Sequence, residues 1–111
     1  MSTYSSVEQI IASYPVRFKP EKAAGVQAVI QLVFKGDGGG TYQLHIDDGT
    51  LEIVEGPHPS PTLTAEASVS DWLLLNNGDI APLGLVMGGR MRFTGSLATA
   101  MRFRSMFETA S

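Results

Sequence analysis

The spacing of apolar residues changes period along the chain. Near the amino terminus apolar side chains recur three and four residues apart, at Val7, Ile10, Ile11 and Tyr14. This spacing predicts a helix, which the serines before it can cap and which Pro15 is expected to end. We therefore expect an amino-terminal helix within residues 1–15.

The period is two in the next part of the chain, residues 26–55. Alternate positions are apolar in residues 26–35, and again in 41–47 and 51–53, which predicts three strands. A glycine run and an Asp-Gly pair separate these segments, and both suit hairpin turns. A strand meander with one fully apolar face is therefore expected.

Residues 62–95 mix strand and helix signals. After a proline-rich loop, residues 62–68 alternate and predict a fourth strand. Ser68 can cap the helix that follows, with Asp71 three residues on as the partner in a capping box. The Asn-Gly pair at 77–78 can end that helix in a left-handed conformation.

A second, shorter helix is expected from the Asp79 and Pro82 start signals to the glycine pair at 88–89. Met91 and Phe93 alternate with polar residues and predict a fifth strand. Ser96 can cap a last helix within residues 96–110. Its apolar stripe is wide and consists of Leu97, Ala100, Met101, Phe103, Met106, Phe107 and Ala110.

Composition narrows the class of protein. A chain of 111 residues fits a single domain, 1–111, and 43% hydrophobic against 17% charged residues argues against disorder. The net charge is −3, and the Lys and Arg residues are scattered, so nucleic acid is not an expected partner. The chain has no cysteine, which removes disulfides and thiolate chemistry. No secretory signal is recognisable, and a cytoplasmic location is expected.

The inventory of reactive groups favours binding over catalysis. His45 and His58 are the only histidines, and their spacing matches no metal-binding motif. His45 falls on the polar face of its strand, where a solvated side chain is expected. The glycine run 36–40 lacks the Lys-Ser/Thr of a phosphate-binding loop. We therefore expect no catalytic residue, no metal, no cofactor and no enzymatic activity.

Methionine and aromatic residues gather in the last part of the chain. Methionine is flexible and polarizable, so it fits irregular apolar surfaces and ligands. A methionine-rich core and the lining of a cavity both account for this pattern, because the period of an apolar stripe does not distinguish them.

Four pieces of the chain, in their order, resemble the sterol carrier protein 2 (SCP2) family. These are GVQAVIQLVF at 25–34, YQLHIDDG at 42–49, the helix from Ser70-Asp-Trp72 to Asn77-Gly78, and GGRMRFTG at 88–95. Arg90 stands where the family usually has Lys, and Ser96 where an acidic residue often follows the glycine. The resemblance implies an α+β fold. In it, a mixed five-stranded sheet is covered on one face by four to five helices, with an apolar tunnel between the layers.

The resemblance also implies a function, the non-catalytic binding or carrying of a fatty acid, a fatty acyl-CoA or a sterol-like lipid. Carried onto this chain, the tunnel would be lined by Ile30, Leu32, Phe34, Leu44, Trp72, Leu75, Leu83, Val86, Met87, Met91, Phe93, Met101, Met106 and Phe107. The alternative is an accessory domain that dimerises or docks on a lipid-pathway enzyme through its methionine-rich helical surface. A monomer, a homodimer and transient membrane contact are all compatible with these interpretations.

Overall fold

The computed structural model describes residues 4–107. Its elements follow the order α1 (Val7–Arg17), the 3-10 helix η1 (Pro20–Lys22), β1 (Gln27–Lys35), β2 (Gly40–Asp47), β3 (Thr50–Glu55), β4 (Leu63–Ser68), α2 (Val69–Asn76), α3 (Pro82–Met87), β5 (Met91–Gly95) and α4 (Leu97–Met106). All five predicted strands are present. Four α-helices within the described residues agree with the predicted architecture.

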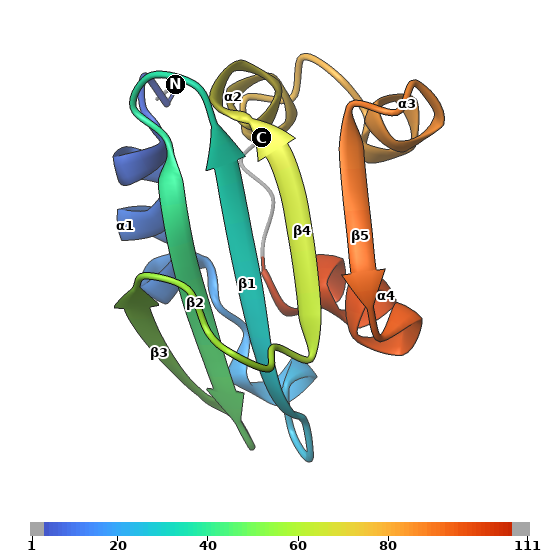
Figure 1. Ribbon diagram of the computed structural model, residues 1–111. Helices are drawn as coiled ribbons and strands as arrows, with labels where there is room; N and C mark the ends of the chain where they lie inside the picture. Colours follow the sequence, from blue (N-terminus) through green and yellow to red (C-terminus); the bar gives the residue numbers. More distant parts are fainter. Residues whose placement is uncertain (1–3, 108–111) are drawn as a thin grey trace.

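The strands form one mixed sheet in the order β3-β2-β1-β4-β5 (Figure 1). β1 and β4 run parallel, and the other neighbours are antiparallel. Both hairpins of the meander have tight turns. The Gly39 N–H donates to the Gly36 carbonyl at 3.0 Å, and Asp48 and Gly49 have φ of 46° and 89°, as a type I′ turn requires. The predicted meander is therefore confirmed.

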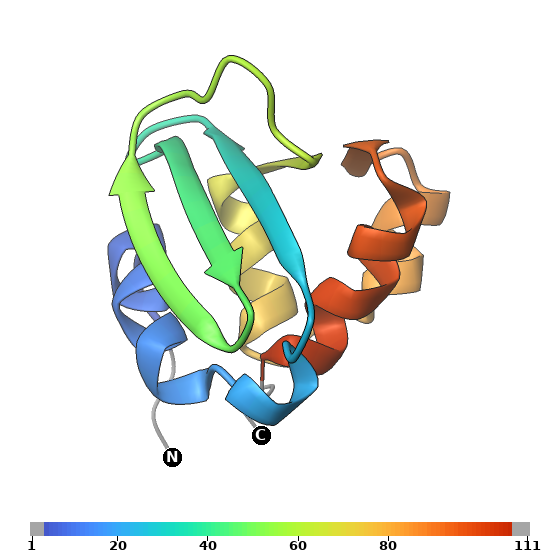
Figure 2. The same ribbon diagram turned by 90° about the horizontal axis from the view of Figure 1, so that it is seen from below.

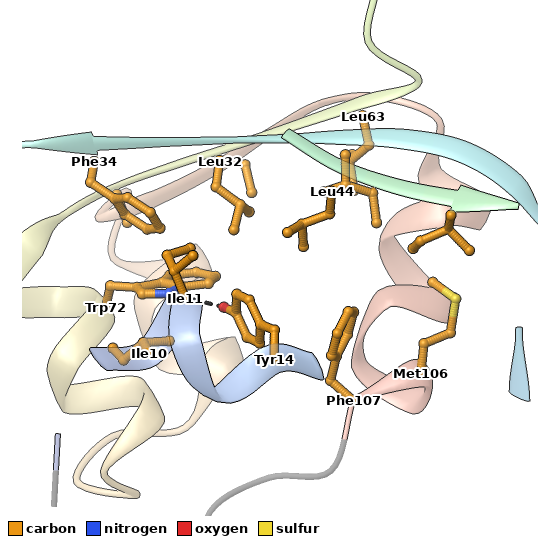
Figure 3. Close-up of a cluster of buried hydrophobic side chains, with 14 of the residues drawn as sticks. Ile10, Ile11, Tyr14, Leu32, Phe34, Leu44, Leu63, Trp72, Met106 and Phe107 are labelled. Atoms are coloured by element: carbon orange, nitrogen blue, oxygen red, sulfur yellow. Dashed lines mark hydrogen bonds between the residues drawn. The ribbon is translucent and has the colours of Figure 1, made fainter. Parts of the chain in front are cut away.

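The helices and one long connection lie on opposite sides of the sheet. Figure 2 shows α1, α2 and α4 on one side and the segment 56–62 crossing the other. Alternation in the strands places one set of side chains under the helices, where they form the core (Figure 3). The core includes Ile10, Tyr14, Ile30, Leu32, Leu44, Leu63, Trp72 and Met106, all at most 4% exposed. No helix within residues 4–107 is long and apolar enough to cross a membrane.

The first helix is longer than its sequence predicts. Pro15 lies inside α1, which continues to Arg17. Proline at this position removes the hydrogen bond that its N–H would donate to Ile11, but the next turn still closes, because the Phe18 N–H donates to the Tyr14 carbonyl at 2.8 Å. Side-chain contacts support the extra turn, because Arg17 Nη1 donates to Ser13 Oγ and to Asn76 Oδ1, both at 3.1 Å.

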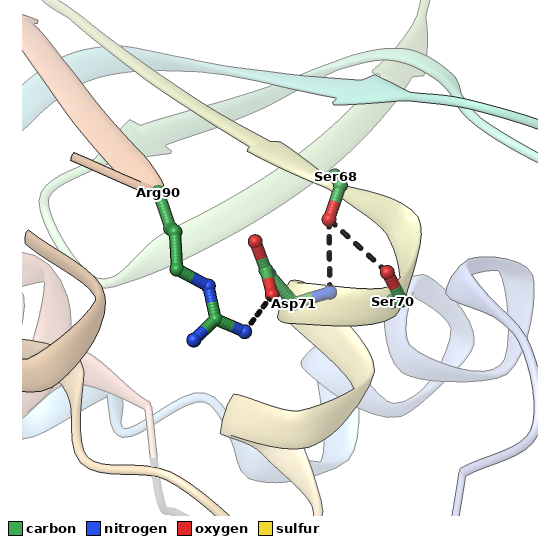
Figure 4. Close-up of polar contacts among 4 residues, drawn as sticks. All are labelled: Ser68, Ser70, Asp71 and Arg90. Atoms are coloured by element: carbon green, nitrogen blue, oxygen red, sulfur yellow. Dashed lines mark hydrogen bonds and ion pairs between the residues drawn. The ribbon is translucent and has the colours of Figure 1, made fainter. Parts of the chain in front are cut away.

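The predicted capping box of α2 is present in part. Ser68 caps the helix, but the Asp71 side chain makes a different contact. The Asp71 N–H donates to Ser68 Oγ at 3.0 Å, as expected. The Asp71 carboxylate pairs with Arg90, which follows α3 (Figure 4). Hydrogen bonds from Arg90 and from the Ser68 hydroxyl hold the pKa of Asp71 below its usual range, although partial burial opposes them. This ion pair links the start of α2 to the start of β5.

The last helix is shorter than predicted. α4 begins after Ser96, whose Oγ accepts from the Thr99 N–H at 3.1 Å, and it ends at Met106. Phe107 then pairs with Phe18, and the Lys19 N–H donates to the Met106 carbonyl at 2.7 Å. Extended pairing replaces another helical turn there. The predicted positions 108–110, including Ala110, lie outside the described residues.

His45 is half-buried, which corrects the expectation of a solvated side chain. It lies on the sheet face opposite the helices, with Nε2 at 2.7 Å from Gln43 Oε1. The His58 ring packs edge-on against it at 5.8 Å between centroids. The His58 N–H donates to Gln31 Oε1 at 2.8 Å, which holds the segment 56–62 over this face. The connection between β3 and β4 therefore covers a histidine that alternation alone places in solvent.

Candidate functional site

A cavity of about 540 Å3 lies between the sheet edge and the helices. It is bounded by α1, α2, the segment between α2 and α3, β5 and α4. The lining residues are Tyr14, Arg17, Trp72, Leu75, Asn76, Gly78, Asp79, Ile80, Ala81, Pro82, Met91, Phe93, Ala100, Phe103 and Phe107. The cavity is partly open to solvent, and we call it the groove.

The inner wall of the groove is aromatic. The Trp72 ring stacks on Phe103 at 6.5 Å between centroids, and Phe103 meets Phe107 edge-on at 5.5 Å. Phe107 lies 4.9 Å from the Tyr14 ring. Such pairs add to the stability from buried area alone, so these four rings form a well-packed surface contributed by α1, α2 and the end of α4.

β5 forms a wall that runs from the core to solvent. Met91 and Phe93 are two residues apart and therefore point to the same side of the sheet. Met91 is 3% exposed and Phe93 is 39% exposed, so the first lies deep in the groove and the second near its mouth. Ala100, on α4, contributes a small side chain to the same cavity. Its size leaves space that a larger residue would fill.

The segment between α2 and α3 forms a further wall because α2 ends in a Schellman motif. The Gly78 N–H donates to the Leu75 carbonyl at 3.2 Å, and the Asp79 N–H donates to the Leu74 carbonyl at 2.8 Å. Gly78 has φ of 80°, which glycine adopts without strain. The chain then turns, and residues 80–82, which are Ile, Ala and Pro, line the groove.

One side of the groove carries polar groups. The Tyr14 hydroxyl accepts from Trp72 Nε1 at 3.2 Å, and burial raises the pKa of Tyr14 well above its usual range. Arg17 Nη1 donates to Asn76 Oδ1 at 3.1 Å, and its guanidinium carbon lies 5.2 Å from the Tyr14 ring centroid. The Asp79 side chain is exposed. The groove is therefore mainly apolar, with a neutral hydroxyl, a guanidinium and an amide close together.

This arrangement suits a ligand that is mostly apolar. Its volume lies within the ~300–1,000 Å3 range of small-molecule sites. Water against aromatic and aliphatic walls is displaced favourably by apolar groups, which is the hydrophobic effect.

The fourteen residues predicted to contact a ligand fall into three groups in the structure. Five line the groove: Trp72, Leu75, Met91, Phe93 and Phe107. Five others are buried in the core between the sheet and the helices and do not line it: Ile30, Leu32, Phe34, Leu44 and Met106. The last four lie at the surface: Leu83, Val86, Met87 and Met101. The structure does not test the ligand contact that the sequence predicts for any of the fourteen.

The surface position of the last group has a simple physical reason. α3 has six residues, and only Leu85 of its apolar residues is fully buried. Within residues 4–107 its other large apolar side chains, Leu83, Val86 and Met87, are 41–79% exposed. Met101 lies on the outer side of α4, one position beyond the groove residue Ala100. A wide apolar stripe therefore extends past the buried surface.

Several groove residues were not predicted from sequence. Ala100 and Phe103 belong to the predicted stripe of the last helix, so their helical spacing was a usable signal. Tyr14 was predicted as an apolar helix position but not as part of a site. Arg17, Asn76 and residues 78–82 carry no pattern that indicates a cavity. They reach it through the extra turn of α1 and the turn after α2.

The chain is similar in fold to several solved structures. The stereoselective inverting sec-alkylsulfatase Pisa1 from Pseudomonas sp. superposes with a TM-score of 0.80 at 16% identity over 96% of this chain. This chain spans only 17% of that enzyme's length. Sterol Carrier Protein 2 Like 2 from Aedes aegypti matches with a TM-score of 0.68 at 20% identity, over 88% of this chain and 91% of that protein.

A third structure, the UbiJ-SCP2 ubiquinone synthesis protein, matches with a TM-score of 0.59 at 15% identity, over 86% of this chain and 73% of that one. No curated protein matches the sequence significantly. The family model of the SCP-2 sterol transfer family matches residues 7–108. The resemblance predicted from the sequence is confirmed, and the chain belongs to the SCP-2 sterol transfer family.

Proposed function

We propose that this chain binds one lipid molecule in the groove and carries it without chemical change. The observation that supports this most strongly is the groove of about 540 Å3 with its four-ring aromatic wall. Membership of a sterol transfer family supports a hydrophobic ligand. A fatty acid, a fatty acyl chain of a larger molecule and a sterol-like lipid all belong to this class.

The polar side of the groove supports a ligand with one polar group. The Tyr14 hydroxyl accepts from Trp72, and a phenol also has a proton to donate. Because its pKa is raised, the hydroxyl keeps that proton at physiological pH. A carboxylate, carbonyl or hydroxyl oxygen of the ligand is a suitable acceptor. The guanidinium of Arg17, close to the Tyr14 ring, favours an anionic or strongly polar oxygen.

A fluorescence titration tests the proposal, because Trp72 is the only tryptophan and lines the groove. Delipidated protein is titrated with palmitate and, separately, with cholesterol, and Trp72 emission is recorded. We expect a saturable change for at least one of them. Native mass spectrometry at saturation should then find one ligand molecule per chain.

Two matched alanines of α4 provide the variant and its control. Ala100 lines the groove, whereas Ala98 lies exposed on the same helix and does not. Ala100→Phe is expected to weaken binding at least about tenfold, because the ring occupies ligand volume and tenfold corresponds to only ~1.4 kcal/mol. Ala98→Phe should bind as the wild type does. Equal affinities of the two variants, or no saturable binding of either lipid, would contradict the proposal.

A second candidate function is that of an accessory domain of a larger enzyme. It is favoured by the TM-score of 0.80 with a part of the alkylsulfatase, higher than the 0.68 with the Aedes aegypti protein. Exposed Leu83, Met87 and Met101 would then cover a protein surface. Sedimentation velocity tests whether the domain associates with itself. A rise from the monomer mass to the dimer mass as the protein concentration increases, in the absence of bound lipid, supports this candidate.

A further inference from the structure

An asparagine and a glycine follow one another at the end of α2. The chain has two asparagines, Asn76 and Asn77, and only Asn77 precedes a glycine. The backbone nitrogen of the next residue can attack an asparagine side chain, and Gly78 hinders this attack least because it has no Cβ. The sequence at 77–78 therefore allows the chain to modify its own backbone.

The reaction needs no partner except water. The Gly78 nitrogen forms a bond to Cγ of Asn77, and the bond from Cγ to Nδ2 breaks. The proton of the attacking nitrogen ends on the leaving NH2 group, which departs as ammonia, and a succinimide ring remains. Water then opens the ring at either carbonyl. One product is aspartate, and the other is isoaspartate, in which the main chain runs through the former side chain and is one CH2 longer. No group is oxidised or reduced.

The structure holds the Asn77 side chain against the backbone of Tyr4, the residue that begins the described part of the chain. The Tyr4 N–H donates to Asn77 Oδ1 at 2.7 Å, and Asn77 Nδ2 donates to the Tyr4 carbonyl at 3.0 Å. The side-chain amide thus pairs with Tyr4 as a peptide group pairs with a neighbouring strand. We call these two hydrogen bonds the Tyr4 clamp.

The backbone of the turn keeps the reacting atoms apart. ψ of Asn77 is −1°, so the Gly78 nitrogen eclipses the backbone nitrogen of Asn77, whereas ring closure needs it on the side of Cβ. The Gly78 N–H also donates to the Leu75 carbonyl at 3.2 Å in the Schellman motif. Rotation about this bond breaks the hydrogen bonds of the turn or those of the Tyr4 clamp, so both sets oppose the reaction.

We infer that Asn77 is a site of spontaneous deamidation and that the Tyr4 clamp controls its rate. The reaction is slow while the clamp is closed and becomes fast when the segment before α1 separates from the end of α2. Two neutral hydrogen bonds of ordinary strength lower the population of the open form roughly 5- to 160-fold. The folded state therefore protects a position that reacts readily in an unfolded chain.

The products change the surroundings of Asn77. Aspartate has a carboxylate in place of the amide, which accepts from the Tyr4 N–H but has no proton to donate to the Tyr4 carbonyl. Isoaspartate also lengthens the main chain inside the turn, so the two hydrogen bonds that close the turn cannot both persist. Because residues 78–82 line the groove, the modification alters its wall.

Mass spectrometry of the ageing protein tests the inference with the full chain. Folded protein and protein in guanidinium chloride are kept in the same mildly alkaline buffer. Deamidation is followed by the gain in mass when OH replaces NH2, and fragmentation of the peptide assigns it to Asn76 or Asn77. We expect the reaction at Asn77 to be at least about tenfold faster in the denaturant. Asn76 is the internal control and should react far more slowly, because the side chain of the next residue hinders the attack.

Two substitutions of Tyr4 test the clamp, because both of its hydrogen bonds involve the Tyr4 backbone. Tyr4→Pro removes the N–H that donates to Asn77, whereas Tyr4→Ala loses the same ring and keeps this N–H. Folded Tyr4→Pro is expected to deamidate about 2- to 13-fold faster than folded Tyr4→Ala, the factor for one neutral hydrogen bond. Thermal unfolding should show that both variants are folded at the temperature of incubation.

Three results would overturn the inference: equal rates at Asn77 in folded and denatured protein, equal rates in Tyr4→Pro and Tyr4→Ala, or a reaction at Asn76 as fast as at Asn77. NMR of the isolated isoaspartate form tests the effect on the turn. The amides of Gly78 and Asp79 should exchange with solvent faster than in unmodified protein, and unchanged exchange would overturn that part. These measurements need no bound lipid, so their outcome is independent of the proposed function.

Discussion

The hydrogen bond between Tyr14 and Trp72 allows a sharp test of the packing around the groove. Tyr14 is 2% exposed and Trp72 is 4% exposed, and Trp72 Nε1 donates to the Tyr14 hydroxyl at 3.2 Å. Tyr14→Phe keeps the ring, with its contacts to Phe107, and removes only the acceptor. The indole N–H, which is only a donor, is left without that partner inside the protein.

The expected loss follows from the energy of an unsatisfied buried donor, about 1–3 kcal/mol. Water that reaches the indole from the groove would bring the loss towards the lower limit. For 111 residues the entropy of unfolding is about 0.23 kcal/mol/K, so the melting temperature should fall by about 4–13 °C. Trp72 fluorescence follows the unfolding directly, because no other tryptophan contributes.

Tyr42→Phe is the control, since Tyr42 is only partly buried on β2 and packs beside Phe34. Its free energy of unfolding should change by less than about 0.5 kcal/mol, as for other surface substitutions. If Tyr14→Phe unfolds within 0.5 kcal/mol of the wild type in urea, the hydrogen bond does not stabilise this wall and the reasoning is refuted.

Two further predictions concern the frame of the groove. The pair with Arg90 lowers the pKa of Asp71 in the folded protein, so the pair stabilises the fold fully above the unfolded carboxyl pKa of ~3.9. This stabilisation is lost as the pH falls through the lower pKa of the folded state. The urea midpoints of wild type and Asp71→Asn should therefore differ at pH 7 and converge below about pH 4; a constant difference would refute the assignment. Gly95→Ala should destabilise by at least about 2 kcal/mol, because φ is 113° and the new Cβ would lie 2.5 Å from the Thr62 carbonyl oxygen. Gly84→Ala on α3 meets only ordinary contacts and should be neutral or stabilising by up to about 1 kcal/mol, so similar losses at both positions would contradict this account.

The elements could be predicted from sequence because local chemistry specifies them. Alternation from Ala28 to Phe34 identified the central strand and its buried face, and the Asp-Gly pair identified a turn with two positive φ angles. Ser68 and Ser96 were expected as helix caps and are. These signals depend on neighbours a few residues away in the sequence.

The groove could not be predicted in the same way, because distant segments form it. Trp72, Met91 and Phe107 come together only when β1 and β4 pair in parallel and β5 joins the edge, and no local pattern specifies that pairing. A helical stripe shows that residues are apolar but not what covers them. For that reason Ile30 and Met101 received the same prediction, although the first is fully buried and the second is 73% exposed.

We expect the lipid to lie in the groove and not in the core between the sheet and the helices. Methyl-labelled protein with bound palmitate allows the intermolecular contacts to be measured by isotope-filtered NMR. We expect contacts from the ligand to methyl groups of Leu75, Ile80, Met91 and Ala100, and none to Ile30 or Leu44. Contacts to Ile30 and Leu44 without contacts to the groove residues would contradict it.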